Sequence, residues 1–239
     1  MKKAISILVI NTNSSQSMTT ALGPILEDLL HPGLLLQYYT APSGRAPPSV
    51  DDATSSVLSA AHTFEDLLPL ITEGKDGGRT HDAYLVACFS DHHLVGMLRE
   101  HTSKPVLGIF EASIMQALAL GQPFGIVTTG QYWEGALTAG VQRIFGSADM
   151  GGAFMGVQST GMTARELHEI EQSVVAEKIA AATSRIVSKG ARTIIMGCAG
   201  MSGMAEAVRK GRGGVDIRVI DAVRSGVTTL EGLVRAQIQ

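Results

Sequence analysis

The chain is organised around Tyr84-Leu85-Val86-Ala87-Cys88-Phe89-Ser90-Asp91. An apolar, β-branched run that ends on a cysteine, followed by small or polar residues and a segment able to form a helix, is typical of a buried parallel strand that delivers a side chain to the mouth of a site. The same pattern returns at Thr193-Ile194-Ile195-Met196-Gly197-Cys198-Ala199-Gly200. These are the only two cysteines, and they lie 110 residues apart. The pattern indicates a duplicated element.

Two further pairs of segments repeat at a similar offset. Residues 7–11 resemble residues 125–128 with an offset near 117, and residues 105–109 resemble residues 217–221 with an offset of 112. Any two buried strands look alike, but three ordered pairs at nearly equal offsets favour a true repeat. The sequence therefore predicts an α/β fold of two similar lobes, each a mainly parallel sheet flanked by helices, related by pseudo-two-fold symmetry with the active site in the cleft between them.

The boundaries of these lobes follow from the same pairs. We expect an N-terminal lobe at 1–112, completed by 219–239, and a C-terminal lobe at 113–218. A chain of 239 residues with 45% hydrophobic residues is long and apolar enough to bury the core of both.

Charge and hydropathy exclude several classes of function. The net charge is −3, and the only local basic cluster, Arg209-Lys210-Gly211-Arg212, is more typical of a solvated loop than of a nucleic-acid surface. The apolar run after Met1-Lys2-Lys3 is too short for a signal peptide, and no segment has 18 uninterrupted apolar residues. We expect a cytoplasmic protein with no nucleic-acid or membrane partner.

Other motifs predict local structure or exclude cofactors. The spacing of Val57, Ala61, Phe64 and Leu68 predicts a helix from about residue 50, and a capping box at Thr163–Glu166 predicts a second helix that Gly190 closes. The glycine-rich stretch 73–80 lacks the order of a phosphate-binding loop and reads as a surface turn. Cys88 with His92 and His93 has no second pair of ligands nearby, so we expect no metal and no cofactor.

Polar residues follow two of the other predicted strands. Asn11-Thr12-Asn13-Ser14-Ser15 comes after the first strand, and Thr128-Thr129-Gly130 comes after its counterpart in the second lobe. Such loops bind ligands in open α/β sheets, although either serine is equally suited to cap the helix that follows.

Two cysteines at corresponding strand ends suit one chemistry in particular. A helix N-terminus can lower the pKa of each thiol, so one thiolate can remove a proton from a carbon next to a carbonyl while the other thiol returns a proton to the opposite face. Two alternatives remain open. Both thiols can be core residues, or one can be a nucleophile, although a hydrolase would need a histidine base and would not explain the second cysteine.

At these residues the chain resembles the hydantoin racemase family, which includes allantoin racemases, within the aspartate/glutamate racemase superfamily. The resemblance spans essentially the whole chain, and Gly197-Cys198-Ala199-Gly200-Met201 is its most specific part. It implies cofactor-independent racemisation of 5-substituted hydantoins or allantoin, with Cys88 and Cys198 as acid and base. It also implies a homo-oligomer and a substrate site that includes Asn13, Ser14, Ser90, Thr128, Thr129, Ala199 and Gly200.

The chain departs from the usual family pattern at Thr12 and at Ser90-Asp91-His92-His93. These changes leave the proton chemistry possible and bear on the pocket for the hydantoin substituent. A decarboxylase or another lyase that works through an enolate in the same scaffold, and an inactive ligand-binding relative, are the alternative functions.

Overall fold

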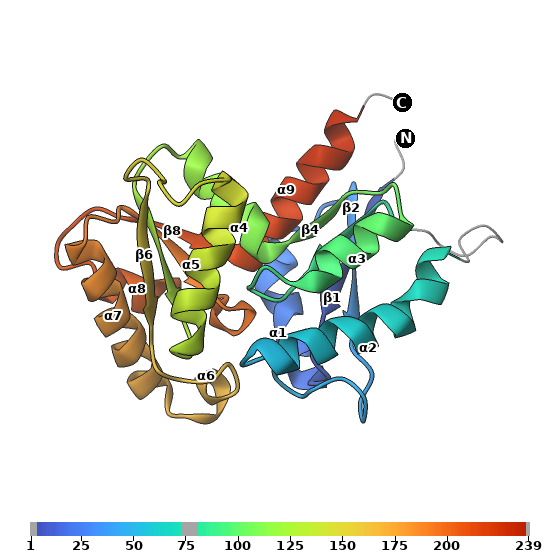
Figure 1. The fold of residues 1–239 in the computed structure, drawn as a ribbon, viewed down its shortest axis with the longest axis horizontal. Coiled ribbons are helices and arrows are strands. Elements are labelled where there is room, and N and C mark those ends of the chain that lie inside the picture. The colour runs from blue at the N-terminus through green and yellow to red at the C-terminus, as the bar shows by residue number, and fades with distance from the viewer. Residues whose placement is uncertain (1–3, 73–80, 238–239) are drawn as a thin grey trace. The chain divides into compact units, whose positions relative to one another are not determined.

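The computed structural model describes residues 4–72 and 81–237, so the turn predicted at 73–80 lies outside the described residues. The chain divides into two compact units (Figure 1). The first unit comprises Met1–Cys88, His92–Ile109 and Gly226–Gln239. The second comprises Phe89–Asp91 and Phe110–Ser225.

The first unit is built on a parallel sheet with the strand order β2-β1-β3-β4. Its strands are β1 (Ile5–Asn11), β2 (Leu34–Thr40), β3 (Ala83–Val86) and β4 (Val106–Gly108). Its helical elements are α1 (Gln16–Leu26), the 3₁₀ turn η1 (Glu27–Leu29), α2 (Ala53–Thr72), α3 (His93–His101) and most of α9 (Ala222–Ala236).

The second unit repeats this architecture with the strand order β6-β5-β7-β8, again parallel throughout. Its strands are β5 (Phe124–Thr128), β6 (Phe154–Ser159), β7 (Thr193–Gly197) and β8 (Arg218–Asp221). Its helical elements are α4 (Ile109–Ala119) apart from its first residue, α5 (Tyr132–Phe145), α6 (Glu166–Glu169), α7 (Gln172–Ser188), the 3₁₀ turn η3 (Ala199–Met201) and α8 (Ala205–Lys210).

The repeat predicted from the sequence is confirmed by the strand orders. The three predicted pairs are β1 with β5, β3 with β7 and β4 with β8, and each pair occupies the same position in its sheet. The edge strands β2 and β6 form a fourth pair that the offsets did not reveal. The predicted class, two parallel α/β halves with flanking helices, is therefore correct.

One face of the first sheet is covered by α2 and α3, which lie side by side (Figure 1). Because alternate strand residues point to the same face, Tyr84 and Val86 of β3 enter this core together. The buried residues of the core are Leu8, Ile10, Ala60, Leu67, Tyr84, Val86, Leu94, Val95, Leu98 and Val106.

The corresponding face of the second sheet is covered by α7 and α8. Ile194 and Met196 of β7 point into this core as Tyr84 and Val86 do in the first unit. They pack with apolar side chains of the two helices, among them Val175, Ile179, Ala182, Ile186, Ala207 and Val208.

The helix predicted from residue 50 is present as α2, but the predicted apolar stripe is not its buried face. Val57 is 51% exposed. The buried residues of α2 are Ser59, Ala60, Thr63 and Leu67. Ser59 and Thr63 are accommodated inside because their hydroxyls donate to the carbonyl of Thr12. The spacing of apolar residues in the sequence does not indicate buried hydroxyl residues of this kind.

The single helix predicted between Thr163 and Gly190 is wrong, because the chain forms two helices there. The capping box itself is present: the Thr163 amide donates to Glu166 Oε2 at 2.7 Å, and the Glu166 amide donates to Thr163 Oγ1 at 3.2 Å. The Thr163 amide and hydroxyl, which both donate to Glu166 Oε2, hold the pKa of the Glu166 carboxyl below its usual value. Ile170 then adopts an extended conformation (φ −87°, ψ 158°), which ends α6 before α7 begins.

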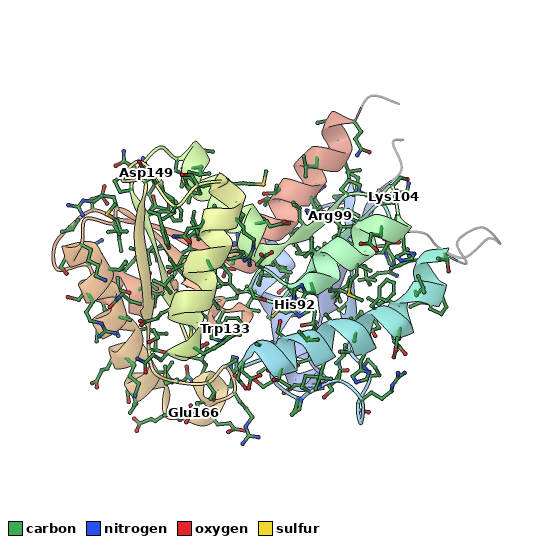
Figure 2. All side chains as sticks on the ribbon, viewed as in Figure 1. His92, Arg99, Lys104, Trp133, Asp149 and Glu166 are labelled. Carbon is green, nitrogen blue, oxygen red and sulfur yellow. The ribbon has the colours of Figure 1, made fainter. Side chains whose placement is uncertain are left out.

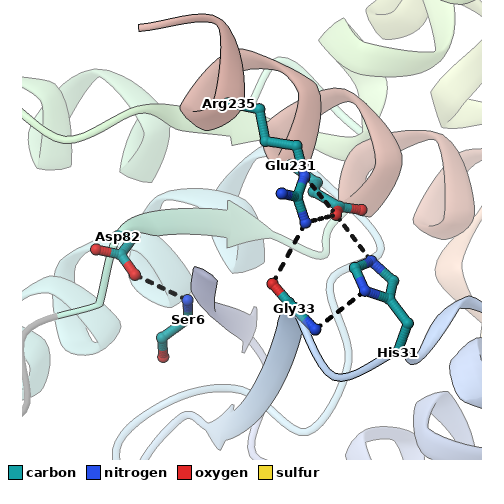
Figure 3. A network of polar contacts seen from close by, with 6 residues as sticks. All are labelled: Ser6, His31, Gly33, Asp82, Glu231 and Arg235. Carbon is teal, nitrogen blue, oxygen red and sulfur yellow. Dashed lines mark hydrogen bonds and ion pairs between the residues drawn. The ribbon is translucent and has the colours of Figure 1, made fainter. Parts of the chain in front are cut away.

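The C-terminal helix α9 is tied to the segment before β2 (Figure 3). Glu231 accepts hydrogen bonds from His31 and Arg235, both at 2.9 Å, and Arg235 also donates to the carbonyl of Gly33 at 3.4 Å. Burial alone would raise the pKa of Glu231, but the bonds from Arg235 and His31 outweigh it and lower that pKa. Among residues 4–72 and 81–237, no helix combines the length and apolarity that crossing a bilayer requires.

Candidate functional site

The two cysteines occupy corresponding places in the two units. Cys88 lies two residues beyond β3, and Cys198 directly follows β7. Each continues the strand alternation that begins at Tyr84 or Ile194, so each packs against the core of its own unit. Both are half-buried thiols that form no disulfide. The structure thus places one thiol at the carboxyl edge of each sheet.

The first unit brings Cys88 and the turn after β1 to the same edge of the sheet. β1 and β3 are adjacent parallel strands, with Ile10 opposite Val86. The Ala87 amide donates to the carbonyl of Ile10 at 2.8 Å, which extends the pairing to the residue before Cys88. The predicted residues Asn13 and Ser14 follow β1 directly and therefore lie at this edge.

Asn11 organises the turn that carries Asn13 and Ser14. Its Nδ2 donates to Asn13 Oδ1 at 3.1 Å and to Thr19 Oγ1 at 2.9 Å. Asn13 Oδ1 also accepts from the Ser15 amide at 2.9 Å, and its Nδ2 contacts the sulfur of Met18. The side chain of Asn13 thus shapes the turn. The Ser14 amide donates to the carbonyl of Pro47 at 2.9 Å, so the loop after β2 lies over the turn.

A buried hydrogen-bonded group joins this turn to α2 and α3. His92 is the N-cap of α3, and its Nδ1 accepts from the Leu94 amide at 3.3 Å (Figure 2). Its Nε2 lies 3.3 Å from Ser59 Oγ, which donates to the carbonyl of Thr12 at 2.6 Å. Sequence reasoning considered His92 only as a metal ligand and missed Ser59.

The second unit brings the other predicted residues to the edge of its sheet. Thr128 lies opposite Gly197, and its hydroxyl donates to the Gly197 carbonyl at 2.8 Å. Thr128 and Thr129 are only 1% and 3% exposed. The Thr128 hydroxyl therefore holds the end of β7, immediately before Cys198, and has only its oxygen lone pairs left for another partner.

The loop after Cys198 carries the predicted residues Ala199 and Gly200 in the 3₁₀ turn η3. The side chain of Asp221, at the end of β8, holds the far end of this loop. Its Oδ1 accepts from the Ser202 hydroxyl at 2.8 Å, and its Oδ2 accepts from the Gly203 amide at 3.1 Å. The Asp221 Oδ1 also accepts from the first amides of α9, at Val223 and Arg224.

Ser90 belongs to the second unit and is almost fully buried. Its neighbour Phe89 packs edge-to-face on Phe110, with ring centroids 5.2 Å apart. Its other neighbour, Asp91, forms an ion pair with Arg143 of α5. The predicted residues thus form two groups: Asn13, Ser14 and Cys88 in the first unit, and Ser90, Thr128, Thr129, Cys198, Ala199 and Gly200 in the second.

The described residues contain no group of three or more His, Cys, Asp or Glu side chains arranged to hold a metal ion. His92 instead uses both ring nitrogens in contacts with the backbone of α3 and with Ser59. Within the first unit, the chemistry available at the sheet edge is that of a thiol beside hydroxyl and amide groups. The second unit offers the same, with backbone amides at the start of η3.

Comparisons with known proteins agree on one family. The sequence profile of the Asp/Glu/Hydantoin racemase family matches residues 7–230. An uncharacterised protein of Schizosaccharomyces pombe is 38% identical over 98% of this chain and 94% of its own length. The hydantoin racemase of Paenarthrobacter aurescens is 27% identical over 95% and 90% of the two chains. The crystal structure of allantoin racemase from Pseudomonas fluorescens has a TM-score of 0.80 at 26% identity, covering 97% of this chain and 91% of that one.

Proposed function

Because the chain belongs to the Asp/Glu/Hydantoin racemase family, a family of isomerases, we propose that it is a cofactor-independent racemase of 5-substituted hydantoins or allantoin. One observation carries the proposal: a half-buried thiol stands at the same topological position in each of two repeated sheets. The relatives at 26–27% identity, a hydantoin racemase and an allantoin racemase, support the substrate class.

In the proposed mechanism Cys88 and Cys198 act on opposite faces of one carbon. The thiolate of one cysteine takes the proton from the carbon next to a carbonyl, and the C–H electron pair moves onto the carbonyl oxygen to form an enolate. The thiol of the other cysteine then protonates the opposite face. The two sulfurs have exchanged protonation states, and proton exchange with solvent restores the starting form.

The remaining predicted residues take supporting roles in this proposal. The amides of Ala199 and Gly200 open η3, where the first N–H groups of a helical turn have no partner within the turn, so they are suited to stabilise the enolate oxygen. Ser14 and Ser90 supply hydroxyls for the polar ring of the substrate. We assign Asn13 and Thr128 a lesser part, that of shaping the two strand ends, since their side chains already hold the backbone around them. Thr129, whose backbone carbonyl accepts from Thr160 Oγ1 at 3.4 Å, is assigned the same part.

The test is a panel of enantiopure 5-substituted hydantoins and allantoin in D₂O, followed by circular dichroism and proton NMR. Loss of optical rotation together with uptake of deuterium at the reacting carbon is expected. A new product would mean a lyase working through the same enolate, and saturable binding without reaction would mean a binding protein. Dialysis against a strong chelator is expected to leave the rate of racemisation unchanged.

Alkylation by iodoacetamide gives an independent check on the thiols. A cysteine that exchanges protons must be partly thiolate and reachable by substrate. Alkylation should therefore abolish racemisation, and bound substrate should slow the alkylation. Peptide mapping is expected to find the label on Cys88 or Cys198. If neither thiol is labelled in the native protein, both are core residues and the mechanism fails.

A further inference from the structure

A hydrogen-bonded chain crosses the interior of the first unit from the start of α3 to the turn after β1. Its members are His92, Ser59 and Thr12, whose exposed fractions are 2%, 0% and 1%. Buried polar groups of this kind are held in place because a lost partner leaves the remaining donor or acceptor unsatisfied, at a cost of about 1–3 kcal/mol. His92, Ser59 and Thr12 therefore form a rigid link between two segments that are far apart in the sequence.

The donor and the acceptor of each hydrogen bond in this link are fixed by the groups at its two ends. The Leu94 amide can only donate, so His92 Nδ1 is an acceptor and the ring proton is on Nε2. Ser59 has a single hydroxyl proton, and the 2.6 Å contact assigns it to the Thr12 carbonyl, which accepts only. Ser59 Oγ then accepts from His92 Nε2–H. Each member thus has a fixed role, and the link defines one orientation of the imidazole ring.

The link closes on the segment that carries Cys88. At the near end of this segment, the Ala87 amide donates to the carbonyl of Ile10. At the far end, His92 reaches the carbonyl of Thr12 through Ser59. Both anchoring carbonyls belong to the exit of β1, immediately before Asn13 and Ser14. The segment with the thiol is therefore pinned at both ends to the turn that carries the predicted substrate-binding residues.

We propose that His92 and Ser59 are positioning residues, which fix Cys88 relative to the turn after β1 and so set the geometry of proton transfer at this thiol. The proposal rests on the proposed function, because it assumes that Cys88 exchanges a proton with a substrate. Neither side chain touches the substrate. Loosening the link lowers kcat more than it raises KM, because the alignment of an acid–base group matters most in the transition state.

The first variant is Ser59→Ala, which removes the middle of the link. The rate of alkylation of Cys88 by iodoacetamide is expected to rise about threefold to tenfold, as loss of one net hydrogen bond would make local opening easier. Cys198 is the internal reference, and its rate should stay the same. Rates are measured for each cysteine in the same sample by quantitative peptide mapping, on protein shown to be folded by circular dichroism.

Thr63→Val is the matched control. Thr63 lies one turn beyond Ser59 on α2, is also fully buried, and donates to the same Thr12 carbonyl at 3.4 Å. The control loses a bond to Thr12 and keeps the link from His92. It is expected to lower the free energy of unfolding somewhat and to leave the Cys88 alkylation rate and the ratio kcat/KM within about twofold, since a change of 0.4 kcal/mol corresponds to a factor of two.

Two variants of His92 separate its two contacts. In His92→Asn the amide oxygen can still cap α3 by accepting from Leu94, but the side chain is too short to reach Ser59. In His92→Gln the longer amide can still donate to Ser59 Oγ, while the cap is lost. We expect His92→Asn to accelerate Cys88 alkylation as Ser59→Ala does, and His92→Gln to stay closer to the unmodified protein.

The outcomes separate this proposal from the function on which it rests. If the link variants change Cys88 alkylation selectively while the native protein racemises nothing, the link is real and the racemase assignment fails. If racemisation is present but Ser59→Ala and His92→Asn leave both the Cys88 rate and kcat unchanged, the positioning role is overturned. An equal rise in the alkylation rates of Cys88 and Cys198 also overturns the positioning role, because such a rise indicates general destabilisation.

Discussion

The segments that follow β3 and β7 carry equivalent thiols but are held by different contacts. The segment after β3 ends at His92, which is tied through Ser59 by neutral hydrogen bonds deep in the first unit. The loop after β7 is tied at Ser202 and Gly203 by the carboxylate of Asp221, which is only half-buried. The repeat therefore preserves the placement of the thiol but not the side chains that support it.

Such a fold tolerates change in the side chains that support a loop more readily than in the strand ends. The strand end is set by backbone pairing, which both sheets share and which any buried, β-branched run can supply. The loop after each strand is held by single side chains, and unrelated contacts can hold it equally well. The two thiols should consequently respond separately to changes in their own supports, and the variants below are designed to test this independence.

The largest effect is expected from Cys88→Ser and Cys198→Ser. Each should lower net racemisation by about 10²- to 10⁴-fold, because a serine hydroxyl is too weakly acidic to supply a useful anion near neutral pH. Each variant should still start the half-reaction of its remaining cysteine. In D₂O one variant is expected to exchange the proton of one enantiomer without inversion, and the other variant should favour the opposite enantiomer, as proton NMR would show.

The controls for this pair are the two variants themselves, compared on both enantiomers. Lack of exchange in a variant is uninformative where the returned proton never meets solvent. Full racemisation by either single variant would contradict the two-thiol mechanism.

The next effect in size is expected at Asp221. In Asp221→Ala the hydroxyl of Ser202 and the amide of Gly203 lose their acceptor, so the loop after Cys198 should loosen. Hydrogen bonds to a charged group contribute about 1.5–3 kcal/mol each in favourable cases, so we expect roughly a tenfold loss of kcat/KM and faster alkylation of Cys198. Peptide mapping should show no change at Cys88.

Asp221→Asn is the matched variant for this site. Its amide oxygen can still accept from Ser202 and from the start of α9, and only the bond from Gly203 is lost. Its effect should fall between the native protein and Asp221→Ala. Equal acceleration at both cysteines in either variant would refute the independence of the two supports.

A smaller effect, on stability, is expected from the residues directly before the cysteines. A Cβ at Gly197 would lie 2.6 Å from Ile126 Cγ2, 2.9 Å from the Val127 carbonyl and 3.2 Å from the ring of Phe89. Gly197→Ala should therefore lower the free energy of unfolding by about 1–3 kcal/mol, as overpacking does. The first unit has Ala87 at this position, 5% exposed, and Ala87→Gly should cost only about 0.5–1 kcal/mol.

Urea unfolding of both variants measures this contrast. Gly197→Ala should also reduce racemisation, since the added methyl group would press on the ring of Phe89, the residue after Cys88. Equal stability of the two variants would show that the end of β7 has room to relax, and that the glycine is not required by packing.

The smallest effect concerns Glu231, which ties α9 to His31 in the segment before β2. Its pKa is lowered in the folded protein, so its contribution to stability is present above the pKa of the unfolded chain and is lost as the pH falls through the folded pKa. Thermal unfolding between pH 7 and pH 3 should show a smaller acid loss of Tm for Glu231→Gln than for the native protein. Identical pH profiles would show that the pairs with His31 and Arg235 contribute nothing measurable, as is common for exposed ion pairs.

The sequence was sufficient for the parts of the fold that depend on local pattern. Apolar runs of four to seven residues identified the buried strands, and their nearly constant offsets revealed the duplication before any pairing was known. The cysteines and the hydroxyl-rich turns were located by the same reasoning, since parallel strands all present their carboxyl ends at one edge.

Tertiary contacts decided what local patterns could not. Ser59 and Thr63 face inward on α2 because the Thr12 carbonyl needs donors, and no periodicity in the sequence encodes that partner. The break at Ile170 is also absent from the local pattern. The apolar spacing of 167–186 suits one helix, but the backbone of Ile170 is extended and ends α6.

The supports of the two cysteines mark the limit most clearly. His92 lies at the start of α3 and Asp221 at the end of β8. Their side chains contact partners 33 and 19 residues away, Ser59 and Ser202. The strands, their repetition and the place of each thiol could be predicted from the sequence, because they follow from the alternation and length of apolar runs. Only the folded chain decided what holds each thiol, because a hydrogen bond between distant segments depends on where both of them lie in space.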